Sequence, residues 1–297
     1  GTYYENINFN GKNISVIGQD RDNPGEEYTT IIDGNESGTV VTFYSGSSSA
    51  LLKNFKIEHG SAIKGGGIYC TQNSSPTLEN LDIKNNYASD HGAGIACDWG
   101  ASPTIKNSNI SYNSGANNGG GIQISDFNNV ILENVIINSN TAANGGGIQC
   151  NSNGSFTADN VTISNNNVSV NGGGMNLNYC SSASLINSII NDNSSQSGGG
   201  IWATESDIEI MISEISNNSS VSDGGGVFSI NSDISISNSD INNNQSGHGA
   251  GLYFSGSNAT LSFVNIVSNS TTYGSAGGFR VESLSNVFMY NCIIASN

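Results

Sequence analysis

Residues 65–86 read GGGIYCTQNSSPTLENLDIKNN, and eight later windows of the chain repeat the same key positions. Each window begins with a glycine-rich triplet that is followed by an apolar residue. The last glycine of the triplet falls at positions 67, 94, 121, 147, 174, 200, 226, 251 and 278, so the steps are 25 to 27 residues long. A fixed period of this length predicts a repeat architecture in which short structural units stack on one another.

An asparagine follows 18 or 19 residues after the last glycine in all nine windows. Three residues before each asparagine stands an isoleucine, from Ile83 in the first window to Ile294 in the last. Asparagine bonds to nearby backbone groups, and equal side chains stacked at the ~4.8 Å strand spacing can hydrogen-bond as a ladder. We therefore expect a stack of nine isoleucines beside a structural ladder of Asn86, Asn113, Asn140, Asn166, Asn193, Asn218, Asn244, Asn269 and Asn297.

Short segments of alternating side-chain direction separate these turns. In Gly67-Ile68-Tyr69-Cys70, we expect Ile68 and Cys70 to point inward and Tyr69 outward. No segment repeats its apolar residues at the helical period, which excludes a helical solenoid. The sequence therefore predicts an all-β fold, a single-stranded right-handed parallel β-helix (β-solenoid) of about eleven coils of 25–27 residues.

We expect one continuous domain with a less regular beginning. Residues 1–60 are predicted to form two entry coils, with strands at 14–17, 29–32, 40–43 and 51–57, and residues 61–297 form the nine regular coils. The chain has 38 glycines and only 35% hydrophobic residues, which suits a narrow core. Its five cysteines show no metal-ligand spacing, so we interpret them as small core residues, with Cys70 and Cys97 adjacent and Cys180 in a turn.

The charge excludes two classes of partner. Eight Lys and Arg against 24 Asp and Glu give a formal net charge of −16. Nucleic acids and anionic lipid surfaces both require a basic face, so we expect neither as a partner. No apolar run reaches the ~18 residues of a membrane span.

The nine coils resemble the middle domains of chlamydial polymorphic outer-membrane proteins, which repeat Gly-Gly-Ala-aliphatic and Phe-x-x-Asn tetrapeptides. The counterparts are Gly65-Gly66-Gly67-Ile68 and Ile83-Lys84-Asn85-Asn86, and the same pair recurs down the chain. More widely, the chain resembles the pectate-lyase-like β-helix superfamily and its bacterial surface adhesins. The resemblance implies a β-helix located outside the cell or on its surface, and it does not imply one activity.

One outward column is a candidate binding surface. It contains Tyr69, Trp202, Phe228, Tyr253 and Arg280, and its three central aromatic residues fall on successive coils. Exposed aromatic stripes bind sugar faces and partner side chains. The alternative is that these residues stack on one another only for stability.

The acidic loop 20–27 is a candidate metal site. Asp20, Asp22, Glu26 and Glu27 offer oxygen ligands around a Pro-Gly turn, a composition that suits calcium. The alternative is a solvated loop, because Arg21 intrudes and the full calcium-loop pattern is absent. We expect no other cofactor.

Catalysis is the least supported reading. Gly247-His248-Gly249 is similar to a polygalacturonase motif, but His91 and His248 share one column of polar turn residues. Glycoside hydrolysis needs two carboxylates about 5–9.5 Å apart, and we find no acid pair beside Asp223 and His248. A lyase needs cationic groups, and residues 107–279 contain no Lys or Arg. We therefore expect no catalytic residues, and an acid cluster on an outer face would favour the enzyme alternative.

The expected function is a non-enzymatic extracellular structural or adhesive solenoid. The chain stops in phase for another coil and shows no cap at either end, which predicts either a segment of a longer surface protein or end-to-end stacking of copies into fibres. Its expected partner is thus another copy of itself, or a glycan or protein of the cell surface. A carbohydrate-binding module and a polysaccharide lyase or glycoside hydrolase are the alternatives.

Overall fold

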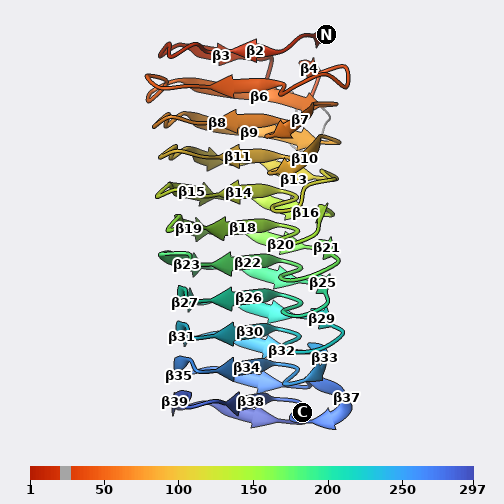
Figure 1. Ribbon diagram of the computed structural model, residues 1–297, viewed down its shortest axis with the longest axis vertical. Helices are drawn as coiled ribbons and strands as arrows, with labels where there is room; N and C mark the ends of the chain where they lie inside the picture. Colours follow the sequence, from red (N-terminus) through yellow and green to blue (C-terminus); the bar gives the residue numbers. More distant parts are fainter. Residues whose placement is uncertain (21–27) are drawn as a thin grey trace.

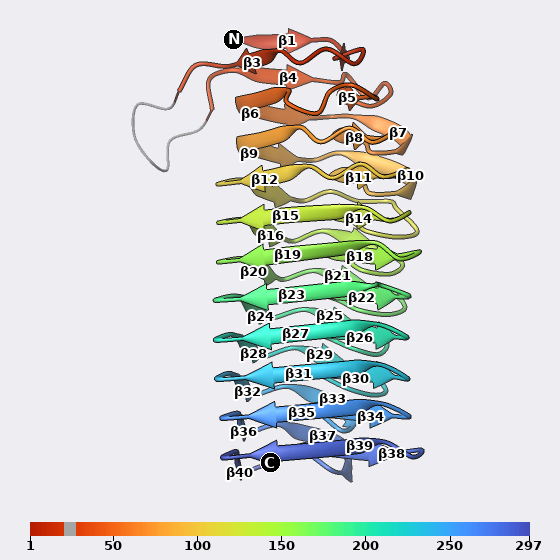
Figure 2. The ribbon, with the colours of Figure 1, turned by 90° about the vertical axis from the view of Figure 1, so that its left-hand side faces the viewer.

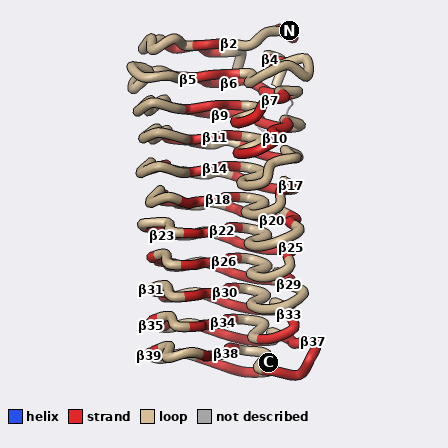
Figure 3. Tube along the Cα trace, in the orientation of Figure 1, coloured by secondary structure: helices blue, strands red, loops and turns tan. Residues whose placement is uncertain are grey.

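In the computed structural model, which describes residues 1–20 and 28–297, the chain winds into stacked coils (Figures 1 and 2). The described residues form forty strands, and every pair of neighbouring strands runs in parallel. Strands and connecting turns alternate around each coil, and no helix occurs among the described residues (Figure 3). The predicted all-β parallel solenoid of about eleven coils is confirmed.

One face of the solenoid is an eleven-stranded sheet with one strand from each coil. Its strands are β2 (Ile7–Asn8), β5 (Val41–Phe43), β8 (Ile68–Cys70), β11 (Ile95–Cys97), β14 (Ile122–Ile124), β18 (Ile148–Asn151), β22 (Met175–Asn178), β26 (Ile201–Thr204), β30 (Val227–Ile230), β34 (Leu252–Ser255) and β38 (Phe279–Glu282). Each regular strand follows directly after a glycine-rich triplet, because the triplet makes the turn into this sheet.

The second sheet has twenty-one strands and consists of two limbs that meet at a bend. The first limb contains β3 (Ser15–Ile17), β6 (Leu51–Glu58), β9 (Thr77–Lys84), β12 (Thr104–Lys106), β15 (Asn129–Glu133), β19 (Ser155–Asp159), β23 (Ser182–Ile186), β27 (Asp207–Met211), β31 (Asp233–Ser237), β35 (Asn258–Ser262) and β39 (Asn286–Tyr290). The second limb contains the ends of β6 and β9 together with β1 (Thr2–Tyr4), β4 (Ile31–Asp33), β13 (Asn109–Ser111), β16 (Ile136–Asn138), β20 (Thr162–Ser164), β24 (Ile189–Asn191), β28 (Glu214–Ser216), β32 (Asp240–Asn242), β36 (Asn265–Val267) and β40 (Ile293–Ala295).

Short strands close the coil between the second limb and the glycine triplets. Six of them form one sheet: β17 (Thr141–Ala142), β21 (Asn167–Val168), β25 (Ser194–Ser195), β29 (Ser219–Ser220), β33 (Gln245–His248) and β37 (Ser270–Ser275). Two others, β7 (Ser61–Lys64) and β10 (Tyr87–His91), form a separate pair.

The core consists of columns of like residues. Ile83, Ile110 and Ile137 are register partners on successive coils, and all three are fully buried. The same stack continues to Ile266, while Ile294 in the last coil is 47% exposed. β-Branched side chains fit this narrow, pleated interior, and the predicted isoleucine stack is confirmed.

The bend between the limbs lies at a column of residues with left-handed backbone. Asn80, Asn107 and Asn134 have φ values between 49° and 56°, and the Asn134 amide donates to Asn107 Oδ1 at 3.0 Å. Asparagine adopts this conformation more readily than most residues. Ile212 and Phe263 interrupt the asparagine column and still adopt it, with φ values of 51° and 55°.

The glycine triplets are required by close backbone contact. Gly119 has φ of +69°, a conformation that glycine adopts at no steric cost. At Gly121, an added Cβ would lie 2.6 Å from the Gly147 carbonyl oxygen and 3.2 Å from Asn140 Nδ2. The third glycine therefore lets one coil lie directly on the next.

The predicted asparagine ladder is confirmed. Asn140 donates twice to Asn166 Oδ1, from its backbone N–H at 2.9 Å and from its side-chain amide at 3.1 Å. The same amide also donates to the Ile110 carbonyl oxygen at 2.9 Å. The pattern runs unbroken from Asn86 to Asn297, and every member up to Asn269 is buried. The ladder thus satisfies the polar groups of a turn that packs inside the core.

The cysteines follow the prediction only in part. Cys70 and Cys97 are buried register partners that remain free thiols. The hydrogen bond with Cys70 and burial raise the pKa of the Cys97 thiol. The interpretation of all five as unbonded core residues is wrong for Cys150 and Cys180, which form a disulfide with a Cα–Cα distance of 5.5 Å. Cys180 lies after β22 and turns inward, where it reaches the strand of the preceding coil.

Candidate functional site

The predicted aromatic column forms a continuous stack. Trp202, Phe228, Tyr253 and Arg280 are register partners on β26, β30, β34 and β38. The ring centroids of Trp202 and Phe228 lie 4.4 Å apart, and those of Phe228 and Tyr253 lie 4.8 Å apart. The Arg280 guanidinium lies 5.5 Å from the Tyr253 ring centroid.

The expectation that this column is exposed is wrong for its central members. Phe228 is 7% exposed and Tyr253 is 8% exposed, while Trp202, Arg280 and Tyr69 are half-buried. The turn that leads into each strand packs against the side chain, since an added Cβ at Gly224 would lie 2.6 Å from Phe228 Cβ and one at Gly249 would lie 3.0 Å from Tyr253 Cδ2. These glycine turns therefore pack against the column and reduce the aromatic surface that a ligand can reach.

The end of the stack carries a polar cluster. The Tyr253 hydroxyl donates to Glu282 Oε2 at 2.5 Å, and Arg280 forms an ion pair with the same carboxylate. Burial and the bond to Glu282 raise the pKa of Tyr253 to about 12. Burial also raises the pKa of Asp223, which pairs through a β-bridge with His248. The stack is thereby fixed in place by its own polar partners.

A second set of aromatic residues is exposed, and the sequence analysis did not single it out. Trp99 and Phe127 occupy the turns that leave the eleven-stranded sheet after β11 and β14. They are 67% and 76% exposed, with φ values of 56° and 63°. Together with Asn73, Gly100 and Asp126, they line a hollow of about 560 Å³.

A neighbouring hollow extends this surface along the stack of coils. It measures about 250 Å³ and is lined by Tyr44, Tyr69, Thr71, Gln72 and Trp99. Trp99 is therefore shared by the two hollows. We call Tyr44, Tyr69, Trp99 and Phe127 the aromatic turn surface: Tyr44, Trp99 and Phe127 follow β5, β11 and β14, and Tyr69 lies on β8 of the coil between Tyr44 and Trp99.

The charged groups beside this surface are paired. Lys64 Nζ lies 2.7 Å from Asp98 Oδ2, and the Tyr69 hydroxyl donates to the same oxygen at 3.3 Å. Burial raises the pKa of Tyr69, and the nearby Asp98 carboxylate adds to this effect. Tyr69 is thus held at the edge of the surface by a bond to a buried carboxylate. Two large aromatic residues in otherwise polar turns were the signal in the sequence, but their exposure depends on a turn geometry that it does not specify.

An acid cluster lies on the outer face of the first limb. Asp207, Glu209 and Asp233 on β27 and β31 line a hollow of about 430 Å³ together with Ser182, Ser235, Asn258 and Thr260. Asp207 and Asp233 are register partners on adjacent strands. Asn258 donates to Asp233 Oδ1 at 2.8 Å, and Ser184 donates to Glu209 Oε2 at 3.3 Å. The cluster was not predicted, because its acids come from different coils and become neighbours only through the register of β27 and β31.

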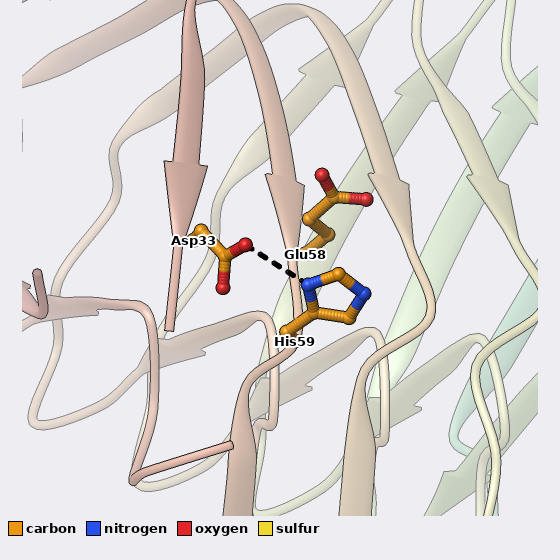
Figure 4. A group of neighbouring side chains, drawn as sticks. All are labelled: Asp33, Glu58 and His59. Atoms are coloured by element: carbon orange, nitrogen blue, oxygen red, sulfur yellow. Dashed lines mark hydrogen bonds and ion pairs between the residues drawn. The ribbon is translucent and has the colours of Figure 1, made fainter. Parts of the chain in front are cut away.

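A third group gathers metal-ligating side chains at the start of the solenoid. Asp33, Glu58 and His59 come from β4 and the end of β6, and their ligand atoms all lie within 4.8 Å of one another (Figure 4). His59 Nδ1 lies 3.0 Å from Asp33 Oδ2. Burial opposes ionisation of Asp33, but its bonds to His59 and Asn35 outweigh burial and lower its pKa. The same bond to Asp33 raises the pKa of His59.

The remaining predicted sites are less informative. Asp22, Glu26 and Glu27 of the candidate calcium loop lie outside the described residues, so that prediction rests on the sequence alone. His91 pairs with Asn118, and His248 pairs with Asp223, in one column of β-bridges. Both histidines therefore lie in the polar turn column that the sequence predicted.

Comparison with known proteins identifies the fold and leaves the activity open. A family model described as a right handed beta helix region matches residues 5–177 and 146–297. No curated protein and no solved structure matches the chain significantly. Among the described residues, no helix has the length and apolar character that a membrane span requires.

Proposed function

The chain belongs to the right-handed β-helix family, and we propose that it is a non-enzymatic extracellular adhesive solenoid. We propose further that it binds glycans through the aromatic turn surface, whose side chains line two adjoining hollows. The finer resemblance to pectate-lyase-like proteins and to chlamydial surface proteins is part of this proposal. The observation that carries it is the exposure of Trp99 and Phe127, at 67% and 76%, around one hollow.

The shape of the surface favours an elongated ligand. Two hollows adjoin at Trp99, and their lining residues come from coils that follow one another along the solenoid. Sugar rings present apolar faces to aromatic side chains and hydroxyl groups to their polar neighbours. Asn73, Gln72 and Asp126 supply polar groups beside the rings. An oligosaccharide that runs across the coils would contact both hollows.

Charge favours a neutral glycan over an acidic one. Lys64 Nζ forms an ion pair with Asp98 Oδ2 at 2.7 Å, and the acidic Asp126 lines the larger hollow. The chain as a whole carries a formal net charge of −16. A polymer of uronic acid would meet repulsion here, since few cations are free to offset its charge.

The disulfide supports an extracellular location. Disulfides persist in oxidising compartments and are rare in the cytosol. The Cys150–Cys180 bridge joins adjacent coils inside the core. An adhesive rod outside the cell would gain resistance to unfolding from such a bond.

A glycan array followed by titration of the best ligand tests the proposal. Trp99→Ala and Phe127→Ala should each weaken binding by about tenfold or more, because each removes a stacking face at the centre of the contact. Phe263→Ala is the matched control, since Phe263 is 58% exposed and has φ of 55° in a different turn. Absence of any glycan ligand, or equal loss in the control, would reject the proposed site.

The acid cluster favours a second candidate function, glycoside hydrolysis. Asp207 and Asp233 stand opposite each other on adjacent strands, which places their carboxyl groups near the ~4.8 Å strand spacing. Retaining glycosidases hold their two carboxyl groups at about 5–5.5 Å. Release of reducing sugar from polysaccharides, lost in both Asp207→Asn and Asp233→Asn but kept in Asp192→Asn, would support this function. No release from a broad polysaccharide panel would exclude it.

A further inference from the structure

The strongest cluster outside the surfaces already described is the group of Asp33, Glu58 and His59. We propose that these three residues bind a divalent transition-metal ion of the zinc class and so tie two adjacent coils together. The proposal is independent of the glycan surface, which lies on other turns. It differs from the candidate calcium loop at residues 20–27 in both its residues and its ion.

The strands place the ligands together. Asp33 on β4 and Glu58 on β6 are register partners, so their side chains leave the sheet on the same face. Asp33 and Glu58 are 8% and 6% exposed, and carboxylates are buried to this degree only when they have partners, which here are His59 and Lys56. His59 follows Glu58 directly, and Figure 4 shows its ring turned toward Asp33. Three ligands from two coils therefore converge without any rearrangement of the backbone.

The distance between the His59 and Asp33 ligand atoms is close to the distance between two ligands of one bound ion. His59 Nδ1 and Asp33 Oδ2 lie 3.0 Å apart, and the Glu58 carboxylate contributes an oxygen within 4.8 Å of both. Ligands bound to zinc at ~2.0–2.2 Å in a tetrahedral arrangement are about 3.3 Å apart. The His59–Asp33 pair would open by a few tenths of an ångström, and Glu58 would move inward. A water molecule would complete the coordination.

The donor set selects the class of ion. Imidazole nitrogen with carboxylate oxygens suits zinc, nickel and cobalt. Calcium takes six to eight oxygen ligands, and magnesium retains several waters in an octahedral shell. Two carboxylates and one imidazole provide too few oxygens for calcium. The site would thus prefer zinc to calcium.

Lys56 is the competitor for this site. Its Nζ lies 2.8 Å from Glu58 Oε2, and both side chains are largely buried. An ion that binds Glu58 displaces this ammonium group, because both compete for the same carboxylate oxygens. Lys56→Met should therefore tighten zinc binding by about tenfold, since it removes a positive charge beside the site.

Calorimetric titration of the full chain with zinc chloride tests the proposal. We expect one ion per chain and at least a tenfold preference over calcium. His59→Asn should abolish binding without loss of the fold, because the equivalent corner position is Asn85, Asn165, Asn217 and Asn243 in other coils, each with φ near 55°. Asp33→Asn and Glu58→Gln should each weaken binding by about 10- to 100-fold or more.

His91→Asn is the matched control. His91 Nδ1 lies 2.7 Å from Asp90 Oδ2, so it offers a histidine–carboxylate pair, and the described residues supply no third ligand to it. The chain contains only three histidines, and nuclear magnetic resonance of their ring nitrogens can follow each one. Zinc should shift the His59 resonances and leave those of His91 and His248 in place. No binding to the wild-type chain, or binding that survives in His59→Asn or disappears in His91→Asn, would overturn the proposal.

Discussion

At the scale of single residues, the solenoid depends on backbone conformations that few side chains tolerate. Each coil bends between the two limbs at one residue with φ near +50° to +65°. Asparagine occupies this position in most coils, and its amide donates to the preceding coil, as from Asn160 Nδ2 to Asn134 Oδ1 at 2.8 Å. Ile212 adopts the same conformation with φ of 51°, although β-branched residues are strained there. The strain is tolerated because register with both neighbouring coils fixes the bend.

Replacement of this residue should therefore stabilise the chain. We expect Ile212→Asn to raise the free energy of unfolding by about 1 kcal/mol, because it relieves left-handed strain and exposes less apolar surface. Ile212 is 59% exposed, so no core contact is lost. Chemical denaturation measures the effect. The reverse change, Asn187→Ile, should lower stability by a similar amount, and equal stability of both variants would contradict the explanation.

Tyr253 should titrate later than an ordinary tyrosine. Burial and the bond to Glu282 raise its pKa to about 12, against an ordinary value near 10. The folded state therefore retains a proton that the unfolded state loses. This contribution to stability is complete below about pH 10 and is lost as the pH rises toward 12.

Nuclear magnetic resonance of ring-labelled tyrosine measures this titration. Glu282→Gln should bring the pKa of Tyr253 part of the way back, since the carboxylate is removed while burial remains. The control is Glu205→Gln, which removes the charge of the carboxylate that accepts from the exposed Tyr179 hydroxyl and should leave the titration of Tyr253 in place. An unchanged Tyr253 titration in Glu282→Gln would show that burial alone accounts for the shift.

At the scale of structural elements, the asparagine ladder joins the turns of neighbouring coils, whose buried polar groups the strands alone would leave without hydrogen-bond partners. Asn166 accepts two hydrogen bonds from Asn140 and donates to Asn193 and to the Ile137 carbonyl. All of these groups are buried. Asn166→Ala should lower the free energy of unfolding by about 2–4 kcal/mol, because it leaves buried donors of Asn140 without an acceptor.

Thermal denaturation compares this variant with a surface control. Asn258→Ala removes an exposed side chain that bonds only to neighbouring side chains, so it should change stability by less than about 0.5 kcal/mol. A comparable effect of the two substitutions would mean that the buried ladder contributes little beyond surface hydrogen bonds.

The elements also show what the sequence could predict. Strands, bends and the ladder repeat in every coil, so a periodic pattern of Gly, Asn and Ile was enough to place them. The disulfide does not repeat, and Cys180 joins Cys150 only because its turn directs one side chain inward. The prediction that Phe228 is exposed was wrong for a related reason. The alternation of side chains along a strand predicts an outward ring, but it does not predict the glycine turn that packs against this side chain. Trp99 and Phe127 were missed because turns vary between coils and carry no period.

At the scale of the whole molecule, charge is distributed unevenly along the solenoid. Residues 107–279 contain eleven Asp and Glu and no Lys or Arg. Parallel stacking aligns several of these acids with one another, as in Glu133 with Asp159, Asp207 with Asp233, and Glu214 with Asp240. Like charges directly opposite each other on neighbouring strands are destabilising. The register that aligns the core therefore also imposes repulsion on the surface.

Salt and charge removal should both relieve this repulsion. The melting temperature should rise with sodium chloride, because mobile ions screen exposed charges over about 10 Å at 0.1 M. Asp233→Asn should raise the free energy of unfolding by roughly 0.5–1 kcal/mol at low salt and reduce the dependence on salt, since Asn at this position can still accept the bond from Asn258. Asp192→Asn removes the same charge from the same cation-free region without an acidic register partner. If the two variants gain equal stability, net charge and not alignment is the cause; if only Asp233→Asn gains, the repulsion arises from the stacking of one coil on the next.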